Sequence, residues 1–334
     1  MNILTLVIKI SFAFLLVFFM SLSVYSQENK TVKISMIGPE NSQLNGIYVW
    51  LDTMRDSLSS TGIKTDLFPN SVLGNEIQRN EQLALGLLEI DDNGGSDLEI
   101  HSPLFKAFIS LPFVFDDYEH VDRLIFNTDF IDRINKDTTP HGSRVIAFAI
   151  LGSMAGIFNS EHAVTSLDDL QRLRIRAMEK SQLGLLNSWQ VQATQVAWLE
   201  VAQALQTEII QGYINPPMVA LMFGHQSVLK HYTDLKIMLS MRMIVVSEDW
   251  YQSLDTQEKN SLYLAISKAN VVNRLWAKNN ALQEKSLLEK AGIRVGSVSN
   301  KQKTQFINLA RQSYSALSPM ATVKELLAIV ESVR

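Results

Sequence analysis

The chain has 334 residues, of which 46% are hydrophobic and 19% charged, and its formal net charge is −4. This length exceeds what one hydrophobic core usually supports, so it predicts two globular lobes, and the composition gives no sign of long disorder. There is no Lys/Arg-rich block of the kind that binds nucleic acid, and the absence of cysteine excludes disulfides, thiolate metal sites and a lipid on an N-terminal cysteine.

The first 26 residues have the pattern of a secretory signal peptide. Lys9 is the only charged residue before the apolar stretch 11–20, and small and polar residues then lead to Ser26. We expect export and cleavage after Ser26, which would make the mature protein periplasmic. An uncleaved signal anchor is the alternative, because residues 3–24 are apolar enough to span a bilayer.

Strand and helix patterns alternate along the rest of the chain, which predicts an α/β fold. No linker separates two halves, so we expect lobes joined by several crossing strands or helices. The predicted strands are 31–38, 63–69, 144–151, 173–177, 209–214 and 293–298. The predicted helices are 46–59, 76–88, 182–189, 199–207 and 249–290, with a capped turn or short helix at 166–169 and two C-terminal helices that begin near Ser299 and Ala321.

The motifs of catalytic and metal sites are missing from the sequence. The six histidines form no His-x-x-x-His pair, and there is no Gly-x-Ser-x-Gly elbow, phosphate loop or Gly-x-Gly-x-x-Gly turn. Residues 89–100 match a calcium loop at Glu89, Asp91, Asn93, Gly94 and Asp97, but Ile100 stands where a bidentate Glu is required. We therefore predict a polar loop there and expect no metal, cofactor or catalysis.

Several segments together resemble one known family. The stretch LRIRAMEK (173–180) and the segment 196–216 are similar to the substrate-binding subunits of tripartite ATP-independent periplasmic (TRAP) transporters, of the dicarboxylate-binding type. Residues 68–76, 111–124 and 246–254 resemble further family segments in the family's order. The matching residues of the first two segments are Leu173, Ile175, Arg176, Glu200, Val201, Ala204, Leu205, Gln206, Gly212, Asn215 and Pro216.

The resemblance implies a two-lobe periplasmic binding protein fold (type II-like) that closes around a ligand cleft and carries out no catalysis. Within that fold we assign 27–151 and about 242–281 to lobe I, and 152–241 and about 282–334 to lobe II. The resemblance also implies that the protein captures a small organic carboxylate and delivers it to integral-membrane TRAP transporter subunits; we expect a monomer. An extracytoplasmic ligand-binding subunit of a sensory system is the alternative.

Arg176 matches the family arginine that binds the ligand carboxylate. On the predicted strand, Arg172, Arg174 and Arg176 share one face, and a solvated face is the simpler interpretation for the first two. The resemblance singles out Arg176, whose planar guanidinium offers two parallel N–H donors to one carboxylate.

Asn215 and Trp198 are the other positions that the resemblance carries over. Asn215 occupies the place of the family's cleft asparagine, although Asn-Pro is also an ordinary turn. Trp198 lies where the family often has an aromatic that packs on the ligand, although a core tryptophan at the start of a helix is the alternative.

The sequence departs from the family in ways that bear on the ligand. Many relatives carry a second cleft arginine where this chain has Ser153, Met154 and Ala155. Glu179 stands where relatives have a small or amide residue, and it adds negative charge near Arg176. Both departures count against a dicarboxylate or sugar acid and leave room for a monocarboxylate, including a zwitterionic one.

Overall fold

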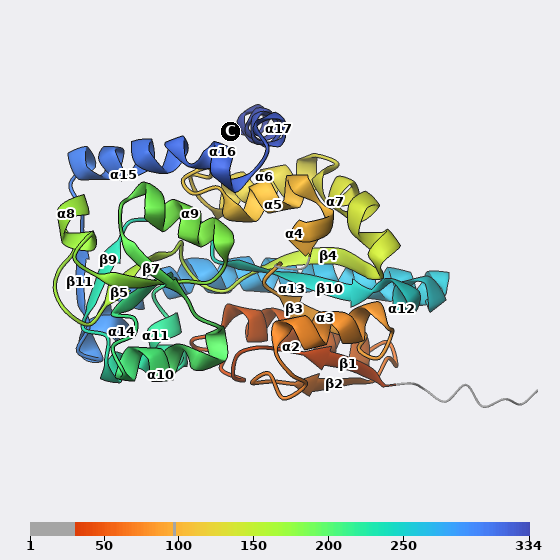
Figure 1. Ribbon diagram of the computed structural model, residues 1–334. Coiled ribbons are helices and arrows are strands. Elements are labelled where there is room, and N and C mark those ends of the chain that lie inside the picture. The colour runs from red at the N-terminus through yellow and green to blue at the C-terminus, as the bar shows by residue number, and fades with distance from the viewer. Residues whose placement is uncertain (1–30, 96–97) are drawn as a thin grey trace, which may run out of the picture. The chain divides into compact units, whose positions relative to one another are not determined.

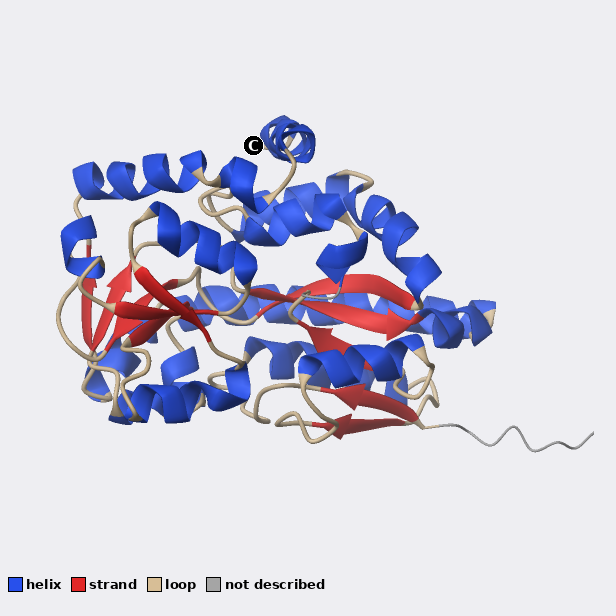
Figure 2. Cartoon of the chain, in the orientation of Figure 1, coloured by secondary structure: helices blue, strands red, loops and turns tan. Residues whose placement is uncertain are grey.

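The computed structural model describes residues 31–95 and 98–334, so the predicted signal peptide, residues 1–26, lies outside the described residues. The segment Val32–Arg334 is held together by its contacts as one unit. It contains two β-sheets with helices packed on them (Figures 1 and 2), which confirms the predicted α/β class. Within the described residues, the helices are too short or too polar to cross a membrane.

The first sheet, called sheet A, has the strand order β2-β1-β3-β10-β4. Strand β1 pairs in parallel with β2 and β3, whereas β10 runs antiparallel between β3 and β4. The strand bounds are β1 Val32–Ser35, β2 Thr65–Phe68, β3 Ile90–Asn93, β4 Ser143–Ile150 and β10 Met241–Ser247.

The second sheet, called sheet B, has the strand order β11-β9-β5-β8-β6-β7. Strand β5 runs antiparallel to its neighbours β8 and β9, and β6 runs parallel to β7 and β8. The strand bounds are β5 Gly156–Asn159, β6 Arg174–Ala177, β7 Gln192–Gln195, β8 Gly212–Asn215, β9 His231–Asp234 and β11 Arg294–Ser297.

The helices that pack with sheet A are α2 Gly46–Ser59, α3 Glu76–Ala84, α4 Leu98–His101, α5 Pro103–Ser110, α6 Tyr118–Asn127, α7 Phe130–Thr138, η1 Thr139–His141, α12 Glu248–Ser253, α13 Thr256–Ala281 and α17 Met320–Ser332. Those that pack with sheet B are α8 Leu167–Leu170, α9 Lys180–Ser188, η2 Trp198–Glu200, α10 Val201–Gln206, α11 Val219–Met222, η3 His225–Ser227, α14 Glu284–Lys290 and α15 Asn300–Gln312. The short helix α16 Tyr314–Leu317 contacts both α9 and α17.

Each sheet is buried on both faces because its strands alternate between two apolar clusters. In β10, Met243 and Val245 belong to one cluster, and Ile244 belongs to the other, which includes the inward side of α2 and α13. In sheet B, Ile157 and Phe158 of β5 enter opposite clusters in the same way. Helices therefore cover both faces of each sheet, as Figure 1 shows for α9 and α10.

Local signals in the sequence set many of the element boundaries. The predicted helix 46–59 is observed as α2, and Ser247 and Ser299 cap α12 and α15 by accepting backbone hydrogen bonds. The predicted helix 249–290 is instead three helices. A new capping box formed by Asp255 and Glu258 begins α13 after a break at residue 254.

Two extended segments connect the sheets side by side. Residues 151–155 lead from β4 to β5, and residues 237–240 lead from β9 to β10. Their backbones are hydrogen-bonded to each other, since the Leu151 N–H donates to the Ser240 carbonyl over 2.8 Å. The Tyr118 hydroxyl donates to the Gly152 carbonyl over 2.6 Å and accepts from the Ser240 N–H over 3.0 Å.

The C-terminal helix packs differently from the sequence assignment, which gives the whole of residues 282–334 to lobe II. Helix α17 packs on α5 and α6, and it places Val323, Leu326 and Val330 in a core cluster of sheet A. Its chain direction changes at Ser318 and Pro319, where the backbone is extended between α16 and α17. The apolar face of α17 is thereby buried on the side of sheet A.

Candidate functional site

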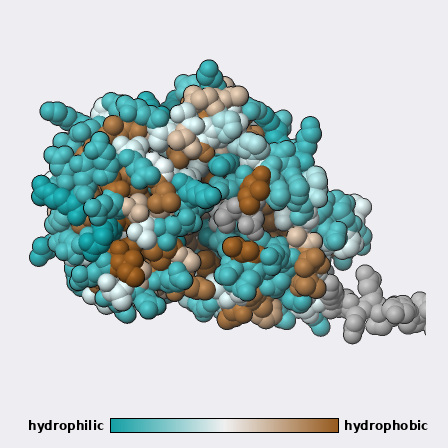
Figure 3. Space-filling view, in the orientation of Figure 1, coloured by the Kyte–Doolittle hydropathy of each residue, from teal (hydrophilic) through white to brown (hydrophobic). Residues whose placement is uncertain are grey.

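A cavity of about 530 Å³ lies where the carboxyl ends of parallel strands from both sheets meet. Ligand sites of open α/β sheets typically lie at this edge, because the loops after parallel strands converge there. From sheet A the cavity is lined by residues that follow or end β1, β2 and β3, and from sheet B by residues that end β6, β7 and β8. Figure 3 shows apolar side chains on both sides of a hollow on this face of the molecule.

Arg176 lies on the sheet B wall of the cavity and is only 3% exposed. Its neighbours in the sheet are Thr194 of β7 and Tyr213 of β8, and its Nε–H donates to the Val196 carbonyl over 2.8 Å. Among the described residues, no carboxylate forms an ion pair with its guanidinium. Burial lowers the pKa of Arg176 to about 10, although its electrostatic interactions with Tyr213 and Glu179 oppose the shift, so Arg176 is a buried cation at neutral pH.

The other arginines of this segment do not reach the cavity. Arg174 is half-buried, and its guanidinium donates to the Glu208 carbonyl over 2.7 Å. Arg172 is exposed. Arg176 is thus the buried arginine of this segment, whereas Arg172 and Arg174 lie at the surface.

Trp198 lies over Arg176, with the guanidinium carbon 5.2 Å from the ring centroid. It also packs edge-on against Phe223, whose ring centroid is 4.7 Å away, and it lines the cavity together with Phe223. Trp198 packs on the core of sheet B and also faces the cavity, so its position is compatible with either interpretation of the sequence.

His225 lies in the same aromatic cluster and is uncharged at neutral pH. Its ring centroid is 5.7 Å from that of Trp198, and its Nδ1 is 3.1 Å from the hydroxyl of Tyr213. Burial and the nearby charge of Arg176 lower the pKa of His225 to about 4. The histidine therefore adds no second positive charge beside Arg176.

Asn215 ends β8 and also lines the cavity. Its Nδ2 group is buried and has no hydrogen-bond partner within the part of the chain that the structure describes. An unpaired buried amide donor is costly unless a ligand or water accepts from it. The amide can therefore donate to a ligand oxygen beside Arg176.

Glu179 occupies the N-cap position of α9, but its side chain makes no capping hydrogen bond. Its carboxylate instead accepts a hydrogen bond from the Ser181 hydroxyl over 2.8 Å. It lines both the large cavity and an adjoining crevice of about 100 Å³ that is lined mainly by apolar residues. Burial and the charges of Glu99 and Glu76 raise the pKa of Glu179 to about 7, although Ser181 and Lys106 oppose the shift.

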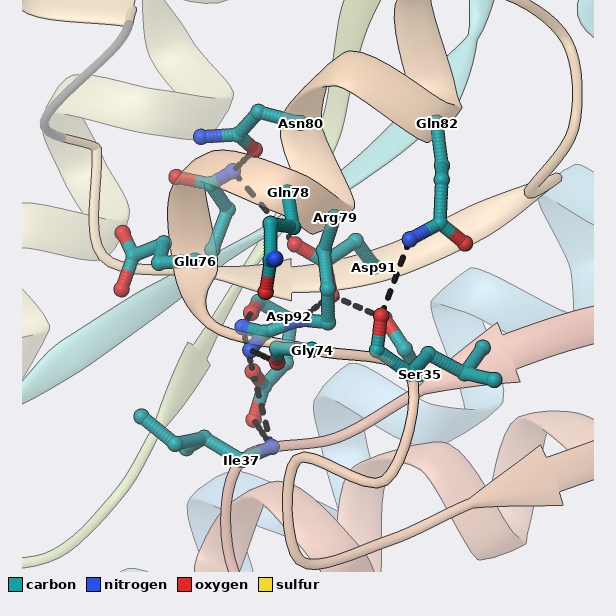
Figure 4. A network of polar contacts seen from close by, with 12 residues as sticks. Ser35, Ile37, Gly74, Glu76, Gln78, Arg79, Asn80, Gln82, Asp91 and Asp92 are labelled. Atoms are coloured by element: carbon teal, nitrogen blue, oxygen red, sulfur yellow. Dashed lines mark hydrogen bonds and ion pairs between the residues drawn. The ribbon is translucent and has the colours of Figure 1, made fainter. Parts of the chain in front are cut away.

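On the sheet A wall, two arginines line the cavity but are already paired with carboxylates. Arg79 is fully buried and donates to Asp91 over 2.8 Å, while Arg242 forms ion pairs with Asp92 and Glu76 over 3.2 and 3.5 Å. Figure 4 shows the polar network around Arg79, in which Ser35 also donates to Asp91. These arginines are neutralised by the chain itself.

This network is not predicted from the sequence, although one of its acidic residues, Asp91, is among those that suggest a calcium loop. Asp91 belongs to strand β3 and is paired with Arg79, whereas Asp97 lies outside the described residues. No group of three or more potential metal ligands is found in residues 31–95 and 98–334. Of the network, only Glu76 lies in a family-like segment, so no local signal points to Arg79 or Arg242.

Comparisons with known proteins agree on one family. Residues 35–318 match the DctP family, described as bacterial extracellular solute-binding protein, family 7. The chain is 24% identical over 278 residues to the sialic acid-binding periplasmic protein SiaP of Vibrio cholerae serotype O1, which covers 79% of this chain and 82% of that protein.

Solved structures share the fold at low sequence identity. A TRAP periplasmic solute-binding protein from Polaromonas sp. JS666, bound to D-erythronate, has a TM-score of 0.81 and 22% identity, with 91% of this chain and 99% of that chain covered. The sugar acid-binding protein DctPAm from Advenella mimigardefordensis, in complex with galactonate, has a TM-score of 0.83 and 18% identity over 91% and 99% of the two chains. The chain thus has the two-lobe fold of TRAP periplasmic binding proteins. Since the family match spans most of the chain, the protein belongs to the bacterial extracellular solute-binding proteins of family 7, which are binding proteins and not enzymes.

Proposed function

We propose that the protein captures a small organic carboxylate in the cavity between the two sheets and delivers it to the integral-membrane subunits of a TRAP transporter. The observation that carries this proposal is a buried arginine, Arg176, on the cavity wall without a carboxylate partner among the described residues. Sialic acid, D-erythronate and galactonate, named with the relatives, are all carboxylates.

The proposed anchor combines charge with geometry. A buried cation without a counterion is unfavourable, and a ligand carboxylate would supply the missing charge. In this proposal the carboxylate accepts two parallel hydrogen bonds from Arg176 and one from the Asn215 amide, while Trp198 packs on the body of the ligand and holds the guanidinium in place. Glu179 completes the ligand-facing set.

The division into lobes is part of the proposal. We assign sheet A with its helices to lobe I and sheet B with its helices to lobe II, and we place α17 with lobe I because its apolar residues pack there. The paired segments 151–155 and 237–240 would act as the hinge. Cleavage after Ser26, a periplasmic location and a monomeric state complete the proposed description, in line with an extracellular solute-binding family.

Arg176→Ala tests the anchor. In a thermal-shift screen of carboxylates followed by calorimetry, a true ligand should raise the melting temperature of the wild type with concentration, because it binds only the folded state. The variant should lose the shift, with an affinity at least about 100-fold weaker, since a charge-assisted bidentate contact contributes several kcal/mol in a buried site.

Arg174→Ala is the matched control. It removes an arginine from the same strand, but one whose guanidinium bonds to a backbone carbonyl at the surface. It should bind the ligand as the wild type does. Equal affinity of wild type and Arg176→Ala would show that the carboxylate is bound elsewhere.

A further inference from the structure

Among the charged residues that line the cavity, Arg176 and Glu179 form no ion pair within the described part of the chain. Three arginines and four acidic residues line it: Arg79, Arg176, Arg242, Glu76, Asp92, Glu179 and Glu200. Arg79 and Arg242 form ion pairs with Asp91, Asp92 and Glu76, so their charges are compensated by the chain. On the sheet B wall, Arg176 is left with two carboxylates nearby, and Glu200 is exposed while Glu179 is largely buried.

The Glu179 side chain is hydrogen-bonded only to a neutral group in the described part of the chain. Among the described residues it forms no ion pair, and its hydrogen bond comes from the neutral Ser181 hydroxyl. Glu99 and Glu76 repel its negative charge, whereas Lys106 and Arg176 attract it without forming an ion pair. It occupies an N-cap position without capping its own helix, so the carboxylate is available to the cavity.

Arg176 and Glu179 are close together in the chain and face one cavity. Arg176 and Glu179 are three residues apart in the chain, so their Cα atoms are at most about 10 Å apart. Both side chains line the same cavity of about 530 Å³. A second anionic group on the ligand would meet the Glu179 carboxylate and be repelled, whereas a hydroxyl would leave this partly buried carboxylate without an ion-pair partner.

We infer that the ligand is a small zwitterion, whose carboxylate binds Arg176 and Asn215 and whose protonated amine binds Glu179. This inference rests on the proposed carboxylate site and adds the chemical class of the second group. A zwitterion supplies an anion to the unpaired cation and a cation to the unpaired carboxylate, so it neutralises both in one binding event. It also removes the need for a second ligand-binding arginine, which this chain lacks at residues 153–155.

The test is a comparison of matched amino and hydroxy acids by isothermal titration calorimetry. The probes are 3-aminopropanoate, 4-aminobutanoate and 5-aminopentanoate, each against its ω-hydroxy counterpart, with galactonate and D-erythronate as polyhydroxy acids. We expect at least one amino acid to bind about 10-fold or more tightly than its hydroxy counterpart. Glu179→Gln should remove that preference, so that the amino acid and its hydroxy counterpart bind the variant with affinities within about three-fold of each other.

Proton release provides a readout that a purely structural role of Glu179 would not produce. The Glu179 carboxyl is partly protonated near pH 7, because its pKa is raised to about 7. An amine bound beside it would favour the carboxylate and release a proton, which titrations in buffers of different ionisation enthalpy detect. Glu179→Gln should abolish this release, whereas Glu208→Gln, which changes an exposed glutamate, should retain it.

The outcomes separate this inference from the proposed function. Hydroxy acids that bind as tightly as the amino acids, with binding that still depends on Arg176, would overturn the zwitterion and leave the carboxylate site standing. An amine preference that persists in a folded Glu179→Gln variant would also overturn it. If neither series binds the wild type at millimolar concentration, both the inference and the proposed function fail.

Discussion

Single residues determine the electrostatics of the cavity, because a few buried groups carry its charge. Arg176 stays protonated although burial lowers its pKa to about 10, whereas His225, in the same aromatic cluster, is held neutral by burial and by that arginine. The neutral histidine can accept a hydrogen bond from Tyr213 at its Nδ1, over 3.1 Å. The chain thus concentrates one positive charge at the site.

His225 makes a testable contribution to the pH dependence of stability. A histidine titrates near pH 6.5 in the unfolded chain but near 4 in the folded protein, so the unfolded state binds more protons between these values. The wild type should therefore lose stability relative to His225→Gln as the pH falls from about 6.5 toward 4, and the difference should be constant above about pH 7. Urea unfolding of both proteins at several pH values measures it; a difference that does not vary with pH would contradict the assignment.

Among the elements, helix α13 has a central role because it joins α2 to sheet A. Asn273 is fully buried in α13, and its amide donates to the carbonyls of Gly46 and Ile150 over 2.8 and 2.9 Å and accepts from the Ile150 N–H. Helices α2 and α13 lie close together at Gly46, where an added Cβ would lie 2.4 Å from the ring of Trp276. The Asn273 side chain thus forms hydrogen bonds with backbone groups at the start of α2 and at the end of β4.

Asn273→Ala should destabilise the protein by about 3 kcal/mol or more, because it leaves three buried backbone groups without this partner at about 1 kcal/mol or more each. The free energy of unfolding in urea is the measurement. Asn279→Ala is the control, since it changes an exposed asparagine of the same helix and should alter stability by about 0.5 kcal/mol or less. Equal effects of the two substitutions would mean that the Asn273 hydrogen bonds do not stabilise the fold.

At the scale of the whole molecule, the C-terminal segment connects the two sheets a further time. Helix α15 packs with sheet B, α16 contacts α9, and α17 packs on α5 near sheet A. The carbonyl of Val330 is 3.0 Å from the His120 Nε2, and Arg123 donates to the carbonyl of Val333. The last helix is thus fixed by apolar packing and by polar contacts with α6.

Leu326→Ala should cost about 2 to 5 kcal/mol of stability, because Leu326 is fully buried between α17 and the helices of sheet A. Its neighbour Leu327 is 37% exposed, and Leu327→Ala should cost much less. Urea unfolding of the two variants side by side is the measurement. If Leu327→Ala proved the more damaging, the helix would pack through a different face.

The sequence predicts individual helices and strands better than it predicts how many there are and which of them lie next to each other. Helix α2, the capped helices after Ser247 and Ser299 and the strand around Arg176 follow from local periodicity and capping. The sequence does not reveal strands β5, β7, β9 and β10. Strand length alone is not the reason, because the predicted β1 and β6 also have four residues; β10 is apolar on both faces and therefore shows no alternating pattern. The break within the predicted helix 249–290 has a local signal that the prediction overlooks, the capping box formed by Asp255 and Glu258.

The sequence by itself determined the α/β class, the family resemblance and the four candidate residues, because strand and helix periodicity and short motifs are local properties of the chain. Only the tertiary structure decided that Arg176, Glu179, Trp198 and Asn215 line one cavity, and that the arginines facing them from sheet A are already paired. The same holds for the packing of α17 with sheet A. Which buried charges find partners depends on contacts between residues far apart in the chain, and no local pattern encodes those contacts.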